Sequence, residues 1–369
     1  MPPVGVLNRA TQVTSLLTIG PVNPVSPPDK DSMRTTMEVR TLTLDTWADF
    51  AEGQEVGVFH TPEVLRAIET HVAGELRLYG AFKGEHLVGL IPLFIRSNKL
   101  YSTVTSPPPG SGIPWLGPVL MPNSPKRSTR ERVNRRFISS VTEHLDLDAH
   151  RTLVHIVTSP SYEDPRPFGW NELTVIPRFT YRIPLANRTL DDVMSDFNSS
   201  TRSEARRVEA VPMRTTVEGV SGAKLVYDQL CDRYQQHGET FPMTWSLMRG
   251  LIEALQHRSQ VYIARDLSGN FISGIIVLYD HSTAYYWQGG VATDIDGVSV
   301  TTLLHRQILD DLINRDTYGS VDSYDLVGAN IDSISKYKAN FGGQLFTYYT
   351  IESSGWPMSV AKRVYSLTK

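Results

Sequence analysis

The feature that most constrains the fold is an internal repeat, because two distant stretches of the chain align without a gap. Residues 83–94 (KGEHLVGLIPLF) and 268–279 (SGNFISGIIVLY) share residues at matched positions, which are Gly84 with Gly269, Gly89 with Gly274, Ile91 with Ile276 and Leu93 with Leu278. A strand-like segment precedes each stretch, so each predicts a β-hairpin that turns at a glycine. The strongly apolar second strand of each hairpin is typical of a strand buried on both faces.

The elements after the two hairpins repeat as well. Each hairpin is followed by a strand, a loop, a helix and another strand. These segments are 99–106, 126–145 and 152–159 after the first hairpin, and 283–292, a helix through 303–309 and 321–328 after the second. The simplest account is two copies of one α/β domain, each built on a mixed sheet of the α+β kind. This account predicts that 75–158 superposes on 260–327.

The N-terminal segment differs from the rest of the chain in composition. Within residues 1–36 the stretch GPVNPVSPPDKDS is rich in Pro, Ser and Asp and lacks periodicity, which predicts that 1–36 form a disordered tail. The sequence leaves open whether this segment is a native tail or the product of an over-long start-codon assignment. The first domain is then expected over 37–186 and the second over 187–369, with the boundary near 186–190.

Charge and cysteine content exclude several classes of protein. The net charge of −3 gives no support for nucleic-acid binding by bulk charge. A single cysteine, Cys231, rules out an internal disulfide framework and fits a reducing compartment. No apolar run approaches the roughly 20 residues of a membrane helix, and the N-terminus lacks a signal-peptide pattern. We therefore expect a soluble cytoplasmic protein without stable membrane insertion, and the histidines show no metal-ligand spacing.

The C-terminal stretch YDLVGANIDSISKYKANFGG carries a resemblance to a known family. Together with the repeated α/β unit, it resembles the Fem-type peptidyltransferases and their FemAB-like relatives in the GNAT acyltransferase superfamily. That family commonly has a Tyr-Asp-hydrophobic-Gly strand end followed by an aromatic-Lys-x-x-Phe-Gly-Gly turn. The matching residues here are Tyr324, Asp325 and Gly328, then Tyr337, Lys338, Phe341, Gly342 and Gly343. The resemblance covers roughly 40–350 and implies two tandem GNAT-like domains.

The resemblance also implies an activity, which is transfer of an acyl or aminoacyl group from an activated carrier to an amine of a cell-envelope or polysaccharide precursor. It implies acyl-CoA or aminoacyl-tRNA as the donor and no permanently bound cofactor. The chain lacks both the coiled-coil arm of some tRNA-using members and a GNAT pyrophosphate loop, so the choice of donor stays open. The alternative is a catalytically silent tandem-GNAT protein that binds a nucleotide-linked ligand or a partner. The oligomeric state is undecided.

Lys338 and Asp325 are the catalytic candidates that the resemblance implies. A fixed lysine can stabilise the oxyanion that forms when an amine attacks a carbonyl. We expect the Lys338 ammonium to lie in the cleft between or beside the two domains, with Tyr337 and Phe341 anchoring the turn around it. The competing interpretation is an exposed lysine near a helix end, where a cation is favoured.

Further residues are candidates for binding a donor or an acceptor. Arg202 and Arg206 are one helical turn apart and could hold one phosphate, or they could belong to a solvated helix. Ser299 begins a helix, where it could help to bind an anion or simply cap the helix. The substrate-binding candidates on aromatic side chains are Tyr286, Trp287 and Tyr337, for which core packing is the alternative.

The long apolar loop 107–118 (PPPGSGIPWLGP) is also a candidate element of the site. Such a loop is too long and too hydrophobic to be an idle connection. It could cover the acceptor, or it could pack Trp115 and Leu116 against the sheet.

Overall fold

The described part of the chain begins where the composition changes from Pro-rich to ordinary. The computed structural model describes residues 37–52, 56–121, 124–147, 151–291, 293–314 and 321–354. The predicted N-terminal tail, residues 1–36, lies outside the described residues. Within the described residues, none of the helices is both long and apolar enough to span a bilayer.

The N-terminal half follows the predicted order of elements. Its hairpin is β2 with β3, and Pro62 at the start of α2 is in the position where helices favour proline. The helices are α1 (Leu44–Ala51), η1 (Val58–His60), α2 (Pro62–His71), α3 (Arg127–His144) and α4 (Arg166–Trp170). The strands are β1 (Met37–Leu42), β2 (Glu75–Lys83), β3 (His86–Ser97), β4 (Ser102–Ser106), β5 (Val119–Leu120), β6 (Thr152–Val157) and β7 (Leu173–Pro184).

The C-terminal half repeats this order, with its own hairpin in β9 and β10. The helices are α5 (Leu190–Ser195), α6 (Ser199–Ala205), η2 (Val208–Ala210), α7 (Val220–Gln236), α8 (Trp245–Ala254), α9 (Val300–Asn314) and α10 (Asp332–Ala339). The strands are β8 (Met213–Glu218), β9 (Ser259–Asp266), β10 (Phe271–Tyr279), β11 (Thr283–Gly289), β12 (Asp294–Ile295), β13 (Val298–Ser299), β14 (Ser323–Asp325) and β15 (Gln344–Ser353).

One mixed sheet joins the two halves. Its strand order in the described chain is β1-β2-β3-β4-β6-β15-β7-β14-β11-β10-β9-β8. The N-terminal run β1-β2-β3-β4-β6 therefore mirrors the C-terminal run β8-β9-β10-β11-β14, and each run ends in a parallel pair, β4 with β6 and β11 with β14. This confirms the predicted fold class and the repeat of the two hairpins with equivalent neighbours.

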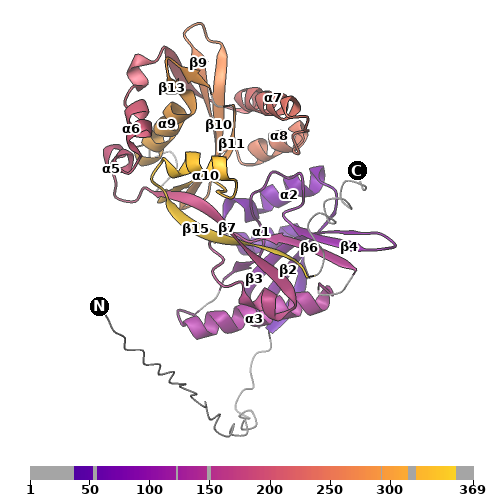
Figure 1. Cartoon of the computed structure of the whole chain (residues 1–369). Coiled ribbons are helices and arrows are strands. Elements are labelled where there is room, and N and C mark those ends of the chain that lie inside the picture. The colour runs from indigo at the N-terminus through magenta and orange to yellow at the C-terminus, as the bar shows by residue number, and fades with distance from the viewer. Residues whose placement is uncertain are drawn as a thin grey trace, which may run out of the picture. The chain divides into compact units, whose positions relative to one another are not determined.

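The last strand of each half is exchanged at the centre of the sheet, where β7 and β15 run side by side (Figure 1). Strand β7 continues from the N-terminal half and pairs with β14, whereas β15 comes from the C-terminus and pairs with β6. Residues 36–369 are one compact unit by their contacts. The predicted domain boundary near 186–190 stays a prediction.

The repeated glycines have two structural roles. Gly84 and Gly269 turn the two hairpins with φ values of 63° and 89°, which favour glycine. Gly89 and Gly274 lie where a helix approaches the sheet. A Cβ atom at Gly274 would be 2.6 Å from the side chains of Val226 and Ile263, so α7 could not pack as closely on any other residue.

Both halves of the chain contribute side chains to one apolar core. Helix α2 packs against α8, and Gly250 provides close approach for the His71 ring. The ring of Phe59 packs on Tyr285 at a centroid distance of 5.2 Å. Trp287 donates from its indole nitrogen to the Gly112 carbonyl at 2.8 Å, so loop 107–118 is tied directly to β11. These contacts hold the two halves against each other.

Candidate functional site

A cavity of about 930 Å³ lies between the two halves of the chain. The N-terminal half contributes residues of η1, the loops around 115–120 and 159–166, and helix α3, and the C-terminal half contributes the turn 280–283 and Tyr285. Arg182 of β7 also lines it. The volume is in the range of small-molecule sites in proteins. Trp115 and Leu116 are buried in the core, which is one of the two roles predicted for loop 107–118, and Trp115 also lines this cavity.

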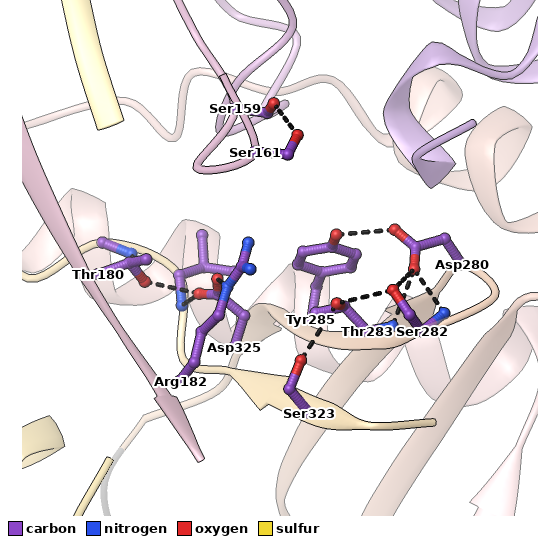
Figure 2. A network of polar contacts seen from close by, with 12 residues as sticks. Ser159, Ser161, Thr180, Arg182, Asp280, Ser282, Thr283, Tyr285, Ser323 and Asp325 are labelled. Atoms are coloured by element: carbon purple, nitrogen blue, oxygen red, sulfur yellow. Dashed lines mark hydrogen bonds and ion pairs between the residues drawn. The ribbon is translucent and has the colours of Figure 1, made fainter. Parts of the chain in front are cut away.

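One wall of the cavity is a row of polar side chains on neighbouring strands, with the Ser159–Ser161 loop opposite (Figure 2). Asp325, at the end of β14, is fully buried. It accepts hydrogen bonds from Thr180 at 2.6 Å and from the Arg182 guanidinium at 2.7 Å, and a third from the Val327 N–H at 2.8 Å. Burial raises the pKa of the Asp325 carboxyl, and the Arg182 charge opposes this effect. Arg182 thus connects the cavity to the predicted catalytic aspartate.

A second polar group on this wall centres on Asp280. This residue follows the β10 strand, and its Oδ1 accepts hydrogen bonds from the backbone N–H groups of Ser282 and Thr283 at 3.0 and 2.8 Å. Its Oδ2 accepts the Tyr285 hydroxyl at 2.7 Å. Burial, reinforced by the Asp280 charge, raises the pKa of Tyr285 well above its ordinary value, so this hydroxyl stays a donor. The arrangement is visible on the right of Figure 2.

The opposite wall is formed by α3 and the loop that follows β6. Glu131 accepts from Arg127 at 3.0 Å and pairs with Arg166 at 3.1 Å. The buried Asn134 accepts a hydrogen bond from the Tyr162 hydroxyl at 2.8 Å, which fixes α3 to this loop. The charged side chains of this wall are therefore largely occupied by one another.

Lys338 lies on α10 and does not belong to the residues that line this cavity. Its side chain is buried, with 7% of its surface exposed. The ammonium donates to the carbonyls of Val327 at 2.5 Å and Gly328 at 2.9 Å, and it lies 5.5 Å from the centre of the Tyr286 ring. Burial lowers the pKa of Lys338 to about 8, although the nearby Asp325 charge raises it. The ammonium was expected in the cleft between or beside the two domains; it is buried, and it is not among the groups that line the cavity.

The backbone that receives the Lys338 ammonium is unusual. Val327 and Gly328 both have positive φ, 51° and 77°. A β-branched residue in this region is a strained outlier, and such strain is typical of functional sites. The turn follows directly after β14, which pairs with β11 only as far as Tyr285 opposite Asp325. Beyond that pair the two parallel strands are no longer paired. The Lys338 ammonium contacts the backbone that follows, at Val327 and Gly328.

Aromatic rings surround the Lys338 site on the side of α9. His305 is fully buried and contacts the rings of Tyr286 and Phe341, each at a centroid distance of 4.8 Å. Burial, with a smaller effect of the Lys338 charge, lowers the pKa of His305 to about 3, so the ring is neutral. Its Nδ1 is 3.0 Å from the Tyr324 hydroxyl, whereas its Nε2 has no hydrogen-bond partner among the described residues.

The structure brings some of the predicted binding residues to this place and not others. Tyr286 and Tyr337 pack around His305 near Lys338. Trp287 faces the opposite side of the sheet, as alternation requires, and is buried in the shared core. Ser299 accepts the Thr302 N–H at 3.5 Å, which is the geometry of a helix cap.

The two arginine candidates lie away from the cavity. Arg202 is on α6, where its guanidinium donates to the Ser195 carbonyl at 2.8 Å. Helix α6 ends at Ala205, and Arg206 is its exposed C-cap, whose N–H donates to the Arg202 carbonyl, so the two arginines are one helical turn apart. Neither arginine is among the residues that line the cavity.

Sequence reasoning missed Arg182, Thr180, Asp280 and His305. Arg182 and Thr180 precede Asp325 by 143 and 145 residues, and no local pattern links residues so far apart. Asp280 has the appearance of an ordinary turn residue, and His305 lies within the apolar stripe of a helix. Within the described residues, no group of three His, Cys, Asp or Glu side chains is arranged to hold a metal ion.

Comparisons with known proteins agree with this geometry. Residues 195–339, which include both Asp325 and Lys338, match a family described as an acetyltransferase (GNAT) domain. No curated protein matches the chain in a sequence search.

Similar folds occur among solved structures. FemX is similar at 10% identity with a TM-score of 0.59, covering 85% of this chain and 96% of FemX. The C-terminal domain of a putative lysylphosphatidylglycerol synthetase from Agrobacterium fabrum is similar at 12% identity and a TM-score of 0.51, covering 88% of this chain and 95% of that one. Residues 195–339 therefore match a GNAT domain, and the chain has a fold similar to that of FemX.

Proposed function

We propose that this protein is an acyltransferase that moves an acyl or aminoacyl group from an activated carrier to an amine. The observation that carries the proposal is the Lys338 ammonium. A lysine has three N–H donors, and two of them are used by the carbonyls of Val327 and Gly328. We infer that the third donates to an oxygen on the substrate. A buried, preorganised donor of this kind is what an oxyanion requires.

The reaction that fits this donor is attack of a neutral amine on the acyl carbonyl carbon. A C–N bond forms, and the electron pair of the C=O bond moves to the oxygen, which the free N–H of Lys338 stabilises. Collapse of this intermediate breaks the bond to the carrier, and the nitrogen loses its proton. The departing carrier oxygen or sulfur takes up a proton, so charge balances.

The position of the cavity supports it as the acceptor site. Arg182 lines the cavity and also pairs with Asp325, whose charge influences Lys338. Arg182 and Asp325 would therefore connect the acceptor in the cavity with the donor carbonyl at Lys338. As acceptor we propose an amine of a cell-envelope or polysaccharide precursor, and as donor an acyl-CoA or an aminoacyl-tRNA. Both donors are cytoplasmic, so we place the reaction there.

The experiment that tests this function compares donors and one matched pair of variants. The protein is incubated with acyl-CoA, or with aminoacyl-tRNA, and a mixture of amines, and release of free CoA or tRNA is measured. Lys338→Met keeps the length of the side chain and removes the charge, so turnover should fall about 100- to 1,000-fold, as for removal of an oxyanion-hole donor.

Lys336→Met is the control. Lys336 lies on the same helix, pairs with Asp332 in solvent at 2.7 Å and has a largely exposed side chain. Its loss should leave turnover unchanged. Wild-type turnover in Lys338→Met would rule out the catalytic role. Release of neither CoA nor tRNA by the wild-type protein would favour the silent, ligand-binding alternative.

A further inference from the structure

We propose that Asp280, together with the rings of Phe59, Trp115 and Tyr285, forms a binding site for an aliphatic ammonium group in the cavity between the two halves. The inference rests on the proposed function only in naming the occupant as the acceptor. The site itself is defined by a buried carboxylate that pairs with no lysine or arginine of the described residues, and by an aromatic cluster that lines the same cavity.

The Asp280 carboxylate is buried and points toward the cavity. It is 8% exposed and lines the cavity. Its two oxygens accept hydrogen bonds from the backbone N–H groups of Ser282 and Thr283 and from the Tyr285 hydroxyl. An ideal Cβ on Gly57 would lie 3.7 Å from Oδ2, so the absence of a side chain at Gly57 leaves this oxygen accessible from the N-terminal half.

Two arginines that line the cavity are paired with carboxylates of the protein. Arg182 is paired with Asp325 at 2.7 Å. Arg166 pairs with Glu131 and Asp164 on the opposite wall. Asp280 has no lysine or arginine within ion-pair distance in the described part of the chain.

The nearest buried histidine does not supply the missing charge. Burial lowers the pKa of His60 to about 4, although the Asp280 charge raises it, so His60 is neutral near pH 7. A buried carboxylate is costly unless it is paired. A cationic ligand would supply the pair.

Three aromatic rings lie around the same place and also line the cavity. Ring centroids are 5.2 Å apart for Phe59 and Tyr285, 5.8 Å for Trp115 and Tyr285, and 6.0 Å for Phe59 and Trp115. Aromatic faces attract an ammonium group within about 6 Å, more strongly when water is excluded. Tyr285 joins the two features, because its ring belongs to the cluster and its hydroxyl donates to Asp280.

The ammonium held by Asp280 is not the reacting amine. Pairing with a carboxylate favours the protonated form, whereas the amine that attacks a carbonyl must be neutral. The occupant should therefore carry two amines, one anchored as an ammonium at Asp280 and one free to react near Lys338. Diamines and diamino acids within larger precursors belong to this class.

The test is binding of 1,5-diaminopentane to the full-length protein by calorimetry, with 1,5-pentanediol as the uncharged equivalent and no donor present. Wild-type protein should bind the diamine at least tenfold more tightly than the diol. Asp280→Asn keeps the size of the side chain, and it should weaken diamine binding about 10- to 100-fold through loss of the charge-assisted contact. Asp266→Asn is the control, because Asp266 accepts the Asn270 N–H at 2.8 Å in an exposed hairpin turn away from the cavity.

The outcomes separate this site from the proposed reaction. Equal binding of diamine and diol by the wild type, or no measurable diamine binding, overturns the site whether or not Asp280→Asn folds. Wild-type diamine affinity in a folded Asp280→Asn variant also overturns it, even if acyl transfer is found. Loss of diamine binding in Asp280→Asn supports the site even if no donor is ever turned over.

Discussion

Replacing Lys338 with methionine should change how the stability of the protein depends on pH. The folded protein lowers the pKa of this lysine from 10.5 to about 8, chiefly through burial. At 1.36 kcal/mol for each pKa unit, this corresponds to roughly 3 kcal/mol by which the charged form is disfavoured on folding. The side chain is 7% exposed, so solvent screening removes little of this energy.

The sign follows from proton binding. Between about pH 8 and pH 10.5 the unfolded chain keeps the Lys338 proton and the folded chain loses it. The free energy of unfolding of the wild type therefore rises with pH across this window. The cost of the buried charge is fully present below the folded pKa and is gone above the unfolded pKa. Methionine carries no proton, so Lys338→Met should lack this rise.

The assay is urea unfolding of wild type and Lys338→Met at half-unit steps from pH 7.5 to 10.5. The wild type should gain up to about 3 kcal/mol relative to the variant over this range. Buried tyrosines that titrate at high pH act on both proteins, so the difference between the two curves isolates Lys338. Parallel curves would refute the reasoning, because they would show that the ammonium is not desolvated.

Near pH 7 the same substitution should change stability little. Methionine removes the buried charge, which costs roughly 3 kcal/mol, but it also leaves the carbonyls of Val327 and Gly328 without their donor. Each unsatisfied carbonyl costs about 1–3 kcal/mol. The two effects nearly cancel, so a loss of turnover in this variant would report on chemistry and not on unfolding.

Three further perturbations test other parts of the structure. His305 is neutral in the folded protein, with a pKa of about 3, so the free energy of unfolding should fall as pH drops from 6.5 toward 3. In urea titrations His305→Gln should reduce this pH dependence by up to about 1.4 kcal/mol per pH unit. An unchanged pH dependence would contradict a neutral, buried His305. Asp325→Ala should cost about 3–5 kcal/mol because it strands the Arg182 charge, and a double-mutant cycle with Arg182→Ala should show coupling, whereas additive effects would deny the pair. Gly274→Ala should cost about 1–3 kcal/mol in chemical denaturation, since its Cβ would meet two side chains at 2.6 Å; wild-type stability would show that α7 can move away.

The predictable part of the fold is the part whose signals are local. The hairpins were identifiable because Gly84 and Gly269 mark turns and the strands after them are continuously apolar. The exchange of β7 and β15 was not, because residues 344–347 at the start of β15 are exposed and carry no burial pattern. Pairing of one half with the last strand of the other depends on contacts across nearly 200 residues, as between Val154 and Ser353.

The site divides in the same way. The motif around Asp325 and Lys338 was recognisable because both residues lie within one short stretch that resembles a family. The direction of the Lys338 side chain could not be predicted. It depends on the positive φ of Val327, which orients the two carbonyls that the lysine contacts, and a valine in a sequence does not indicate a positive φ. Arg182 and Asp280 look ordinary in sequence, and only the assembled cavity gives them a role.

The exchanged strands have a consequence for how the protein is made on the ribosome. The free edge of β6 receives its partner only when β15 emerges, and the hydrogen bond from Val154 to Ser353 spans 199 residues. At translation rates of about 5–20 residues per second, the N-terminal half waits roughly 10–40 s with this edge unpaired. An unpaired strand edge is a template for pairing with other nascent chains. Chaperone demand and synthesis rate, as well as the final stability, should therefore decide how much active protein a cell obtains.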